Sequence, residues 1–253
     1  MKGIVLNMPS VEQEVGVSCS ENETLAARKL LVLNASLPLE AIRERKLEAT
    51  VTNTDLDGFF EHVWTVHPFA TLVTSNDGIS EYGSPEVHAL AQRHTFIEGK
   101  VGRFPFLKWL EPLNFLISQI DIFFSLVRLI RKERISVVDA WTPLYPGLFA
   151  WALSRLCGIP FGIRVVANND KIYETTGRPL ERRLWFSRKI EKIVERFVLN
   201  RADLVAAVNN DNLNFALANG AVPEKSTLFR YGNMINKRHF IEPQILFFYK
   251  IKL

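Results

Sequence analysis

Cysteine is scarce in this chain of 253 residues, which contains only Cys19 and Cys157. The two lie far apart and form no CxxC pair, so a small disulfide-stapled scaffold is excluded and no zinc or redox pair is visible. A large excess of charge of one sign is also absent, because the sequence has 31 Lys and Arg and 27 Asp and Glu. A net charge of +4 gives no reason to expect a nucleic-acid partner.

Long apolar runs are missing as well. The N-terminal segment MKGIVLNMPSVEQEVG lacks the apolar core of a signal peptide. The most apolar window, residues 113–130, contains Asn114, Gln119, Asp121 and Arg128, which a membrane-spanning helix would rarely carry. We therefore expect a cytoplasmic protein whose only membrane contact is peripheral, at the inner face of the cell membrane.

Common catalytic and cofactor motifs are absent from the sequence. It contains no GxSxG, HExxH, P-loop or GxGxxG pattern. These absences argue against serine-type hydrolysis, zinc proteolysis and dinucleotide binding. The sequence predicts neither a metal nor a cofactor.

Apolar runs and helical patterns alternate along the chain. Strands are predicted at residues 29–34, 62–66, 95–101, 137–141, 162–167, 204–208 and 227–231. Helices are predicted at residues 39–46, 111–133, 146–157, 179–200 and 212–219. Strands that alternate with helices in this way form a mostly parallel sheet. The predicted fold class is α/β, with helices on both faces of that sheet.

Three segments in the second half occur in an informative order. They are VVDAWTPLYPGLFAWALSRLCGIP, RADLVAAVNNDNLNFALANGAVPEKSTLF and RYGNMINKRHF. In order and spacing they resemble the N-terminal, acceptor-side domain of retaining glycosyltransferases of the family-4 type. That family has the two-domain GT-B architecture, so the resemblance, which covers residues 29–240, implies a single Rossmann-like half of a GT-B fold.

The resemblance also implies what the chain lacks. In this family the C-terminal domain binds the nucleotide sugar and supplies two Glu eight positions apart, whereas this chain ends thirteen residues after Phe240. Glu40 and Glu48 have that spacing, but they lie in the first helical region, where chance explains it better. We expect a loosely ordered leader at 1–27, one domain at 28–240, and an apolar tail at 241–253 where the second domain would begin.

The function implied is the acceptor-binding half of a glycosyltransferase. It would transfer a sugar from a nucleotide sugar to a glycan or lipid-linked acceptor, with the donor held by a missing or separate domain. We expect the isolated chain to be inactive. The family often has a glycine-rich turn after the first strand and a His after the strand at 162–167, and both are absent here, so no catalytic residue is assigned.

Candidate acceptor-binding residues follow from the fold, because ligands of open α/β sheets bind outside the carboxyl ends of the strands. These residues are Ser36, His67, Trp141, Thr142, Tyr145, Asn168, Asn169 and Asp170. Aromatic rings, hydroxyls and amides suit a sugar, and a histidine suits proton transfer near neutral pH. Each has a structural alternative that the sequence leaves open: rings packed beneath a loop, a simple turn at 168–170, and a structural histidine.

The predicted basic helix suggests a second surface. Between Glu181 and Arg201, seven cations face three acids, which gives +4. The candidates for contact with an anionic surface are Arg182, Arg183, Arg188 and Lys189. A further basic group, Arg128, Arg131, Lys132 and Arg134, follows the apolar window, and Phe104, Phe106 and Trp109 precede it. A solvated helix face is the alternative.

Other functions remain open at this stage. A non-catalytic binding or membrane-docking module would share the same fold, because fold alone does not fix function. A sugar-nucleotide enzyme such as an epimerase is a weaker alternative, because the Gly-rich fingerprint is absent.

Overall fold

A computed structural model describes residues 28–52, 54, 58–70, 82–181, 184–185 and 187–229. The leader at 1–27, the tail at 241–253, and Arg182 and Arg183 lie outside the described residues. The domain boundaries at 27 and 240 therefore stay predictions.

Eight strands form one sheet in the order β3-β4-β2-β1-β5-β6-β7-β8. They are β1 Lys29–Leu33, β2 His62–His67, β3 Glu86–Ala91, β4 His94–Glu98, β5 Val137–Ala140, β6 Phe161–Val165, β7 Leu204–Ala207 and β8 Ser226–Leu228. Every neighbouring pair is parallel except β3 with β4. The central strands are buried on both faces, as parallel strands usually are, and their residues are mostly apolar except for Asp139 on β5 and Arg164 on β6.

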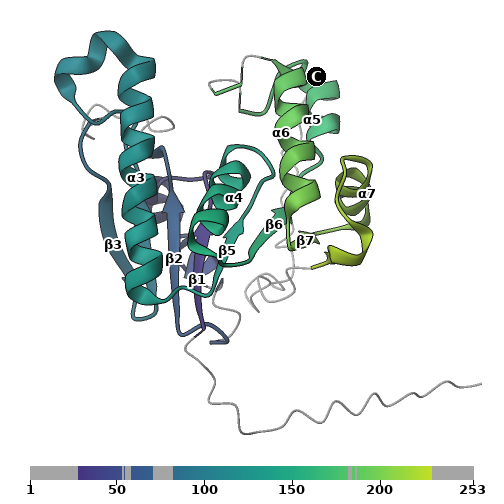
Figure 1. The fold of residues 1–253 in the computed structure, drawn as a ribbon, viewed down its shortest axis with the longest axis horizontal. Coiled ribbons are helices and arrows are strands. Elements are labelled where there is room, and N and C mark those ends of the chain that lie inside the picture. The colour runs from purple at the N-terminus through teal and green to yellow at the C-terminus, as the bar shows by residue number, and fades with distance from the viewer. Residues whose placement is uncertain are drawn as a thin grey trace, which may run out of the picture.

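Helices cover both faces of the sheet (Figure 1). They are α1 Leu39–Glu44, α2 Glu48–Thr52, α3 Glu111–Glu133, α4 Tyr145–Cys157, α5 Asn169–Thr176, α6 Arg188–Arg201 and α7 Asn210–Ala218, with short 3-10 helices η3 Pro105–Leu110 and η4 Pro223–Lys225. The side chains of β4 show the two layers. Phe96 packs with Leu39 and Ile42 of α1, whereas Ile97 joins the core beneath α3 and α4. The predicted fold class is confirmed.

The predicted basic helix at 179–200 is wrong in its first half. The described residues between 179 and 187 form no helix, and the preceding helix α5 has already ended at Gly177, which adopts φ +65°. Helix α6 begins only after Ser187, whose hydroxyl accepts a hydrogen bond from the Lys189 N–H. Helix α5 itself, which begins at Asn169, was not predicted.

Strand β3 was also not predicted. Its sequence EVHALA alternates in character and lies at the exposed edge of the sheet, where it runs antiparallel to β4. Such an edge strand lacks the continuous apolar run by which the other strands were recognised.

The order of the strands places a crevice in the middle of the sheet. From β1 the chain first forms β2, β3 and β4 on one side, with β4 between β2 and β3, and then returns to add β5 through β8 on the other. This reversal is a topological switch point between β1 and β5, where ligands of open α/β sheets bind at the carboxyl ends.

Candidate functional site

The residues that follow β1, β2 and β5 meet at this switch point. Leu33 pairs with Val66 on one side and Ala140 on the other, so the next residues are Asn34, His67 and Trp141. The Asn34 N–H donates to the Val66 carbonyl at 3.0 Å, and the Trp141 N–H donates to the Leu33 carbonyl at 3.1 Å. Three loops that are distant in sequence are thus fixed side by side.

His67 is fully buried at this edge. Its ring packs edge-on against Phe69 with centroids 5.4 Å apart, and backbone groups of Ala35 and of His67 itself lie against the imidazole. Burial lowers the pKa of His67 to about 4, so the ring is neutral at physiological pH. The sequence left two roles open for His67, an acid or base near neutral pH and a structural histidine. A fully buried imidazole with a lowered pKa favours the structural role.

Trp141 and Thr142 follow β5 and are half-buried. The Arg164 guanidinium lies 5.7 Å from the centre of the Trp141 ring, so this ring packs against the sheet as well as bordering the crevice. The buried Thr142 hydroxyl has no hydrogen-bond partner among the described residues. Ser36, on the loop after β1, is exposed, and its N–H donates to Asn34 Oδ1 at 3.0 Å.

Tyr145 begins α4 and connects three elements at the crevice. Its hydroxyl donates to Gln119 Oε1 at 2.8 Å, and Gln119 Nε2 donates to the Pro68 carbonyl at 3.1 Å. The Tyr145 ring also meets Phe69 edge-on at 5.4 Å. Gln119 was not predicted as a site residue, although a polar residue within an apolar helix is a signal that it has a buried partner.

Glu181 is the second residue of this edge that sequence reasoning missed. Its Oε2 accepts hydrogen bonds from the Tyr145 N–H at 3.1 Å and from Trp185 Nε1 at 2.8 Å. The carboxylate therefore sits at the N-terminus of α4, where the helix dipole favours negative charge. Burial nevertheless raises the pKa of Glu181 to about 7.

Asn168, Asn169 and Asp170 lie after β6 and are held by the chain itself. Asn168 is the N-cap of α5, because its side-chain oxygen accepts from the Asp170 and Lys171 N–H groups. Asn169 is buried and donates to Glu195 Oε1 at 2.7 Å, while Asp170 forms ion pairs with Arg188 and Lys192. The segment is thus a capped helix start rather than a free turn.

Arg188 is at the centre of an ionic network between α5 and α6. Its guanidinium contacts Asp170 at 2.7 Å, Glu195 at 2.8 Å and Glu191 at 3.2 Å. Burial acts to lower the pKa of Arg188, but the hydrogen bonds to Glu195 and Asp170 outweigh it and raise the pKa. The expectation that Arg188 faces an anionic surface is corrected, because its charge is directed inward. Lys189 is exposed.

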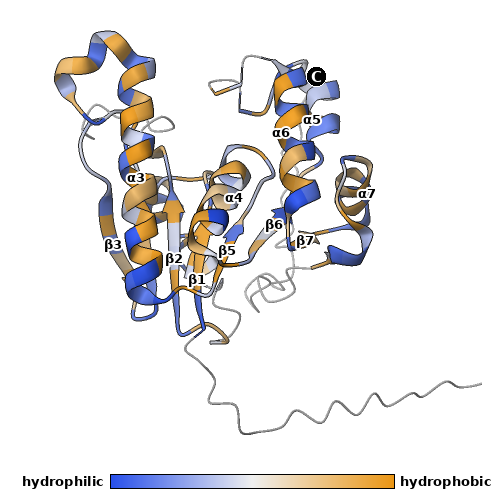
Figure 2. Cartoon of the chain, in the orientation of Figure 1, coloured by the Kyte–Doolittle hydropathy of each residue, from blue (hydrophilic) through white to orange (hydrophobic). Residues whose placement is uncertain are grey.

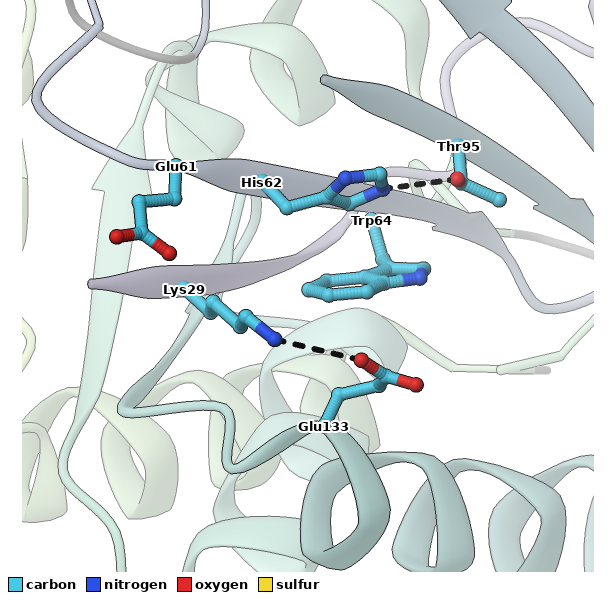
Figure 3. A pocket seen from close by; sticks show the side chains of 6 residues that line it. All are labelled: Lys29, Glu61, His62, Trp64, Thr95 and Glu133. Carbon is cyan, nitrogen blue, oxygen red and sulfur yellow. Dashed lines mark hydrogen bonds and ion pairs between the residues drawn. The ribbon is translucent and has the colours of Figure 1, made fainter. Parts of the chain in front are cut away.

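A pocket of about 410 Å³ lies at the opposite, amino edge of the sheet. Lys29 and Glu133 form an ion pair at 3.3 Å along its wall, and His62 Nε2 lies 2.9 Å from Thr95 Oγ1 (Figure 3). The His62 and Trp64 rings lie against each other with centroids 4.1 Å apart and their planes tilted by 39°. Because ligands of open α/β sheets bind at the carboxyl edge, this pocket is separate from the candidate site.

One group of described residues has the spacing of a cation site. The ligand atoms of Glu86, His88 and Glu98 all lie within 4.8 Å of one another. The buried Lys100 ammonium lies 2.6 Å from Glu86 Oε1 and lowers the pKa of Glu86, and Glu98 Oε1 accepts the Leu39 N–H at 2.8 Å. The two carboxylates of this cluster are therefore already paired, Glu86 with the Lys100 ammonium and Glu98 with the Leu39 N–H.

The structure brings five of the eight predicted residues to the switch point: Ser36, His67, Trp141, Thr142 and Tyr145. Asn168, Asn169 and Asp170 lie one strand further along, after β6, in structural hydrogen bonds. Rings, hydroxyls and amides at one edge suit a polyhydroxylated ligand. One buried polar atom at this edge, the Thr142 hydroxyl, has no hydrogen-bond partner among the described residues.

Residues 71–229, more than half of the chain, match the family model of Glycosyltransferase Family 4. No curated protein sequence matches the chain significantly.

Several solved structures are similar to this chain at low sequence identity. A sucrose-phosphate synthase from Thermosynechococcus elongatus is 12% identical over 80% of this chain, with a TM-score of 0.51. Anabaena HepE in complex with UDP is 13% identical over 80% of the chain, and UDP-N-acetylglucosamine 2-epimerase from Rickettsia bellii is 11% identical over 80%, each with a TM-score of 0.44. This chain spans 48%, 43% and 44% of those three chains, about half of each.

Proposed function

Because this chain belongs to glycosyltransferase family 4, we propose that it is the acceptor-side half of a glycosyltransferase. In this proposal a glycan or lipid-linked acceptor binds at the carboxyl edge between β1 and β5. A nucleotide sugar enters through a second domain, carried on the same or another polypeptide. We propose that this transfer takes place in the cytoplasm.

One observation supports this place for the acceptor above others. At the switch point, the Thr142 hydroxyl is buried without a hydrogen-bond partner among the described residues. Unpaired buried polar groups cost free energy, so a ligand that supplies donors and acceptors is stabilised there. Saccharide hydroxyls supply both.

The surrounding contacts suit a preorganised site. Tyr145, Gln119 and the Pro68 carbonyl form a hydrogen-bonded chain across the crevice, which fixes α3 and α4 relative to β2. Glu181 is fixed in turn by two donors at the start of α4. A rigid edge of this kind orients an acceptor hydroxyl without further ordering cost.

Sugar transfer also needs positive groups that face the leaving diphosphate across a cleft. In GT-B enzymes that cleft lies between two domains, so we expect no nucleotide-sugar turnover by this chain alone. Robust turnover by the purified chain would refute the half-enzyme proposal.

Acceptor binding is tested by saturation-transfer NMR of the purified chain with candidate saccharides. Thr142→Val should weaken binding of the recognised saccharide by about tenfold, because one good hydrogen bond is lost. Thr227→Val, on the exposed strand β8, is the matched control. Equal affinities of the two variants would place the acceptor elsewhere.

A non-catalytic binding module on the same fold is the alternative, and the same titration addresses it. A module would bind its ligand fully without a second domain. A half-enzyme should gain affinity when a family-4 donor domain and nucleotide sugar are added.

A further inference from the structure

The first half of α3 has an inverted distribution of polar and apolar side chains. Asn114, Ser118 and Gln119 face the protein interior and are at most 5% exposed. On the outer side, Leu113, Leu116, Ile120 and Phe124 are each about half exposed. A surface helix in water normally shows the opposite arrangement.

The buried polar residues of this helix are all satisfied. Asn114 Oδ1 accepts from the Arg103 and Phe104 N–H groups at 2.8 and 2.9 Å, and Ser118 Oγ donates to the Lys100 carbonyl at 2.7 Å. These bonds fix the rotation of the helix about its axis. The apolar side chains are therefore held outward by specific contacts, and a rotation that buried them would break these bonds.

The apolar surface continues into η3. Phe106 is 73% exposed and Trp109 is 85% exposed, with Phe104 and Leu110 beside them. Figure 2 shows this end of α3 and the short helix before it as largely hydrophobic, beyond the ends of the strands. We call Phe104, Phe106, Trp109, Leu110, Leu113, Leu116, Ile120 and Phe124 the apolar face.

Charged residues around the apolar face are mostly cations. Five of the exposed charged residues between 105 and 134 are basic, and Glu111 is the one exposed acid. Arg128 and Arg131 continue the line of Leu113, Leu116, Ile120 and Phe124 in steps of three and four residues along the same side of the helix. The Lys108 ammonium lies 5.5 Å from the centre of the Trp109 ring.

We propose that the apolar face docks this domain on an anionic lipid bilayer, with α3 lying along the interface. Aromatic and aliphatic side chains enter the boundary of the headgroups, where Trp is favoured, and the cations pair with lipid phosphates. Residues 105–133 are long and apolar enough to cross a membrane by length and composition. Their inner side packs on the sheet core, so the helix rests on the bilayer rather than crossing it.

Docking in this manner places the bilayer beside the candidate site. Helix α3 follows β4 and precedes β5, so its N-terminal end and η3 lie at the carboxyl edge of the sheet (Figure 1). A lipid-linked acceptor could then reach the switch point from the membrane surface. This choice of acceptor rests on the proposed function, whereas the docking surface itself does not.

Vesicle flotation of the full chain tests the proposal without an activity assay. The chain should float with vesicles of phosphatidylcholine and phosphatidylglycerol, bind vesicles of phosphatidylcholine alone less tightly, and be released by salt as its charges are screened. Phe106→Ser combined with Trp109→Ser should lower the partition coefficient at least about tenfold, because two large apolar side chains no longer leave water.

Two matched controls isolate the surface. Ile190→Ser combined with Ile193→Ser removes exposed apolar side chains from α6 and should leave flotation unchanged. Arg128→Gln, Arg131→Gln and Lys132→Gln together should weaken binding only to the anionic vesicles, whereas Arg43→Gln, Arg45→Gln and Lys46→Gln should not.

Three outcomes would overturn the proposal. One is absence of flotation with either vesicle, and another is equal loss of flotation in the η3 variant (Phe106 and Trp109) and the α6 variant (Ile190 and Ile193). The third is a dimer in light scattering that the Phe106 and Trp109 changes dissolve while flotation stays absent, which would make the apolar face an interface between two copies. Circular dichroism melts should be unchanged in every variant, since all the substituted side chains are exposed.

Discussion

At the scale of single residues, the sheet contains a buried ion pair. Arg164 on β6 contacts Asp139 on β5 at 2.5 Å, and both are nearly buried. Gly162 makes room for this pair, since a Cβ there would lie 3.2 Å from Asp139 Oδ1. Removal of one partner would leave the other charge buried without compensation.

We predict that Arg164→Met lowers the free energy of unfolding by about 3–5 kcal/mol, because Asp139 then remains buried and unpaired. Urea denaturation measures the loss. The double variant Arg164→Met with Asp139→Leu should recover most of it, and Arg155→Met, at an exposed position, should stay within about 0.5 kcal/mol of the parent. A small effect of the single variant would mean that the pair is not isolated from water.

Glu181 gives a second residue-scale prediction, on pH. Its folded-state pKa is raised from 4.5 to about 7, so its contribution to stability is fully present below pH 4.5 and is lost as the pH rises through 7. Glu181→Gln should remove this loss. The difference in unfolding free energy between the parent and the variant should therefore shift in favour of the variant between pH 5 and pH 8, by up to about 3 kcal/mol.

The parent has to be compared with the Glu181→Gln variant, because the buried histidines change the free energy of unfolding with pH in the opposite direction to Glu181. Burial lowers the pKa of His67 and of His94 to about 4, so each costs stability as the pH falls from 6.5 toward 4. The parent and the variant share these histidine contributions. The difference between their unfolding free energies, measured by urea denaturation, therefore reports the contribution of Glu181 alone. A difference that does not change with pH would show that Glu181 titrates normally.

At the scale of secondary structure elements, Asn168 decides where α5 begins. We predict that Asn168→Ala lowers the free energy of unfolding by about 1 kcal/mol through loss of the N-cap, while Asn168→Ser keeps most of the stability. Thermal melts distinguish this role from acceptor binding. If Asn168 contacted an acceptor instead, both variants would lose saccharide affinity and neither would lose stability.

Most elements followed from the sequence because the parallel strands are apolar runs and the long helices have a clear period. The bounds of α3 were predicted to the residue, and Gly158 ends α4 as expected, at φ +70°. The failures share a cause. Edge strand β3 and helix α5 are short and half exposed, so their pattern is weak, and the charged stretch before Ser187 resembled the helix that follows it.

The candidate site was only partly predictable. The predicted topology located the site, since the ends of the strands bring together Ser36, His67, Trp141, Thr142 and Tyr145. The topology did not predict the hydrogen-bond partners of Tyr145, because Gln119 and Glu181 reach the edge from a distant helix and loop. Nor could it show that Arg188 turns inward, since a run of cations does not reveal which of them meets buried carboxylates.

At the scale of the whole molecule, one continuous sheet connects every described strand. The main apolar core likewise extends from α3 to α7 without a break. We predict a single cooperative unfolding transition in urea, with far-ultraviolet circular dichroism and tryptophan fluorescence coincident. Two separate midpoints would show that the halves on either side of β1 unfold independently.

The switch in strand order also governs how the chain folds. Ser136, immediately before β5, donates a hydrogen bond from its hydroxyl to the carbonyl of Lys29, which is 107 residues earlier in the chain. Strand β1 therefore has a free edge until β5 has left the ribosome, about 5–20 s later at ordinary rates of synthesis. During that interval the nascent chain exposes an unpaired apolar strand and the hydrophobic segment of α3 together. Contacts this distant in sequence fold slowly, so early binding of a chaperone or of the bilayer would protect the chain while its centre is still open.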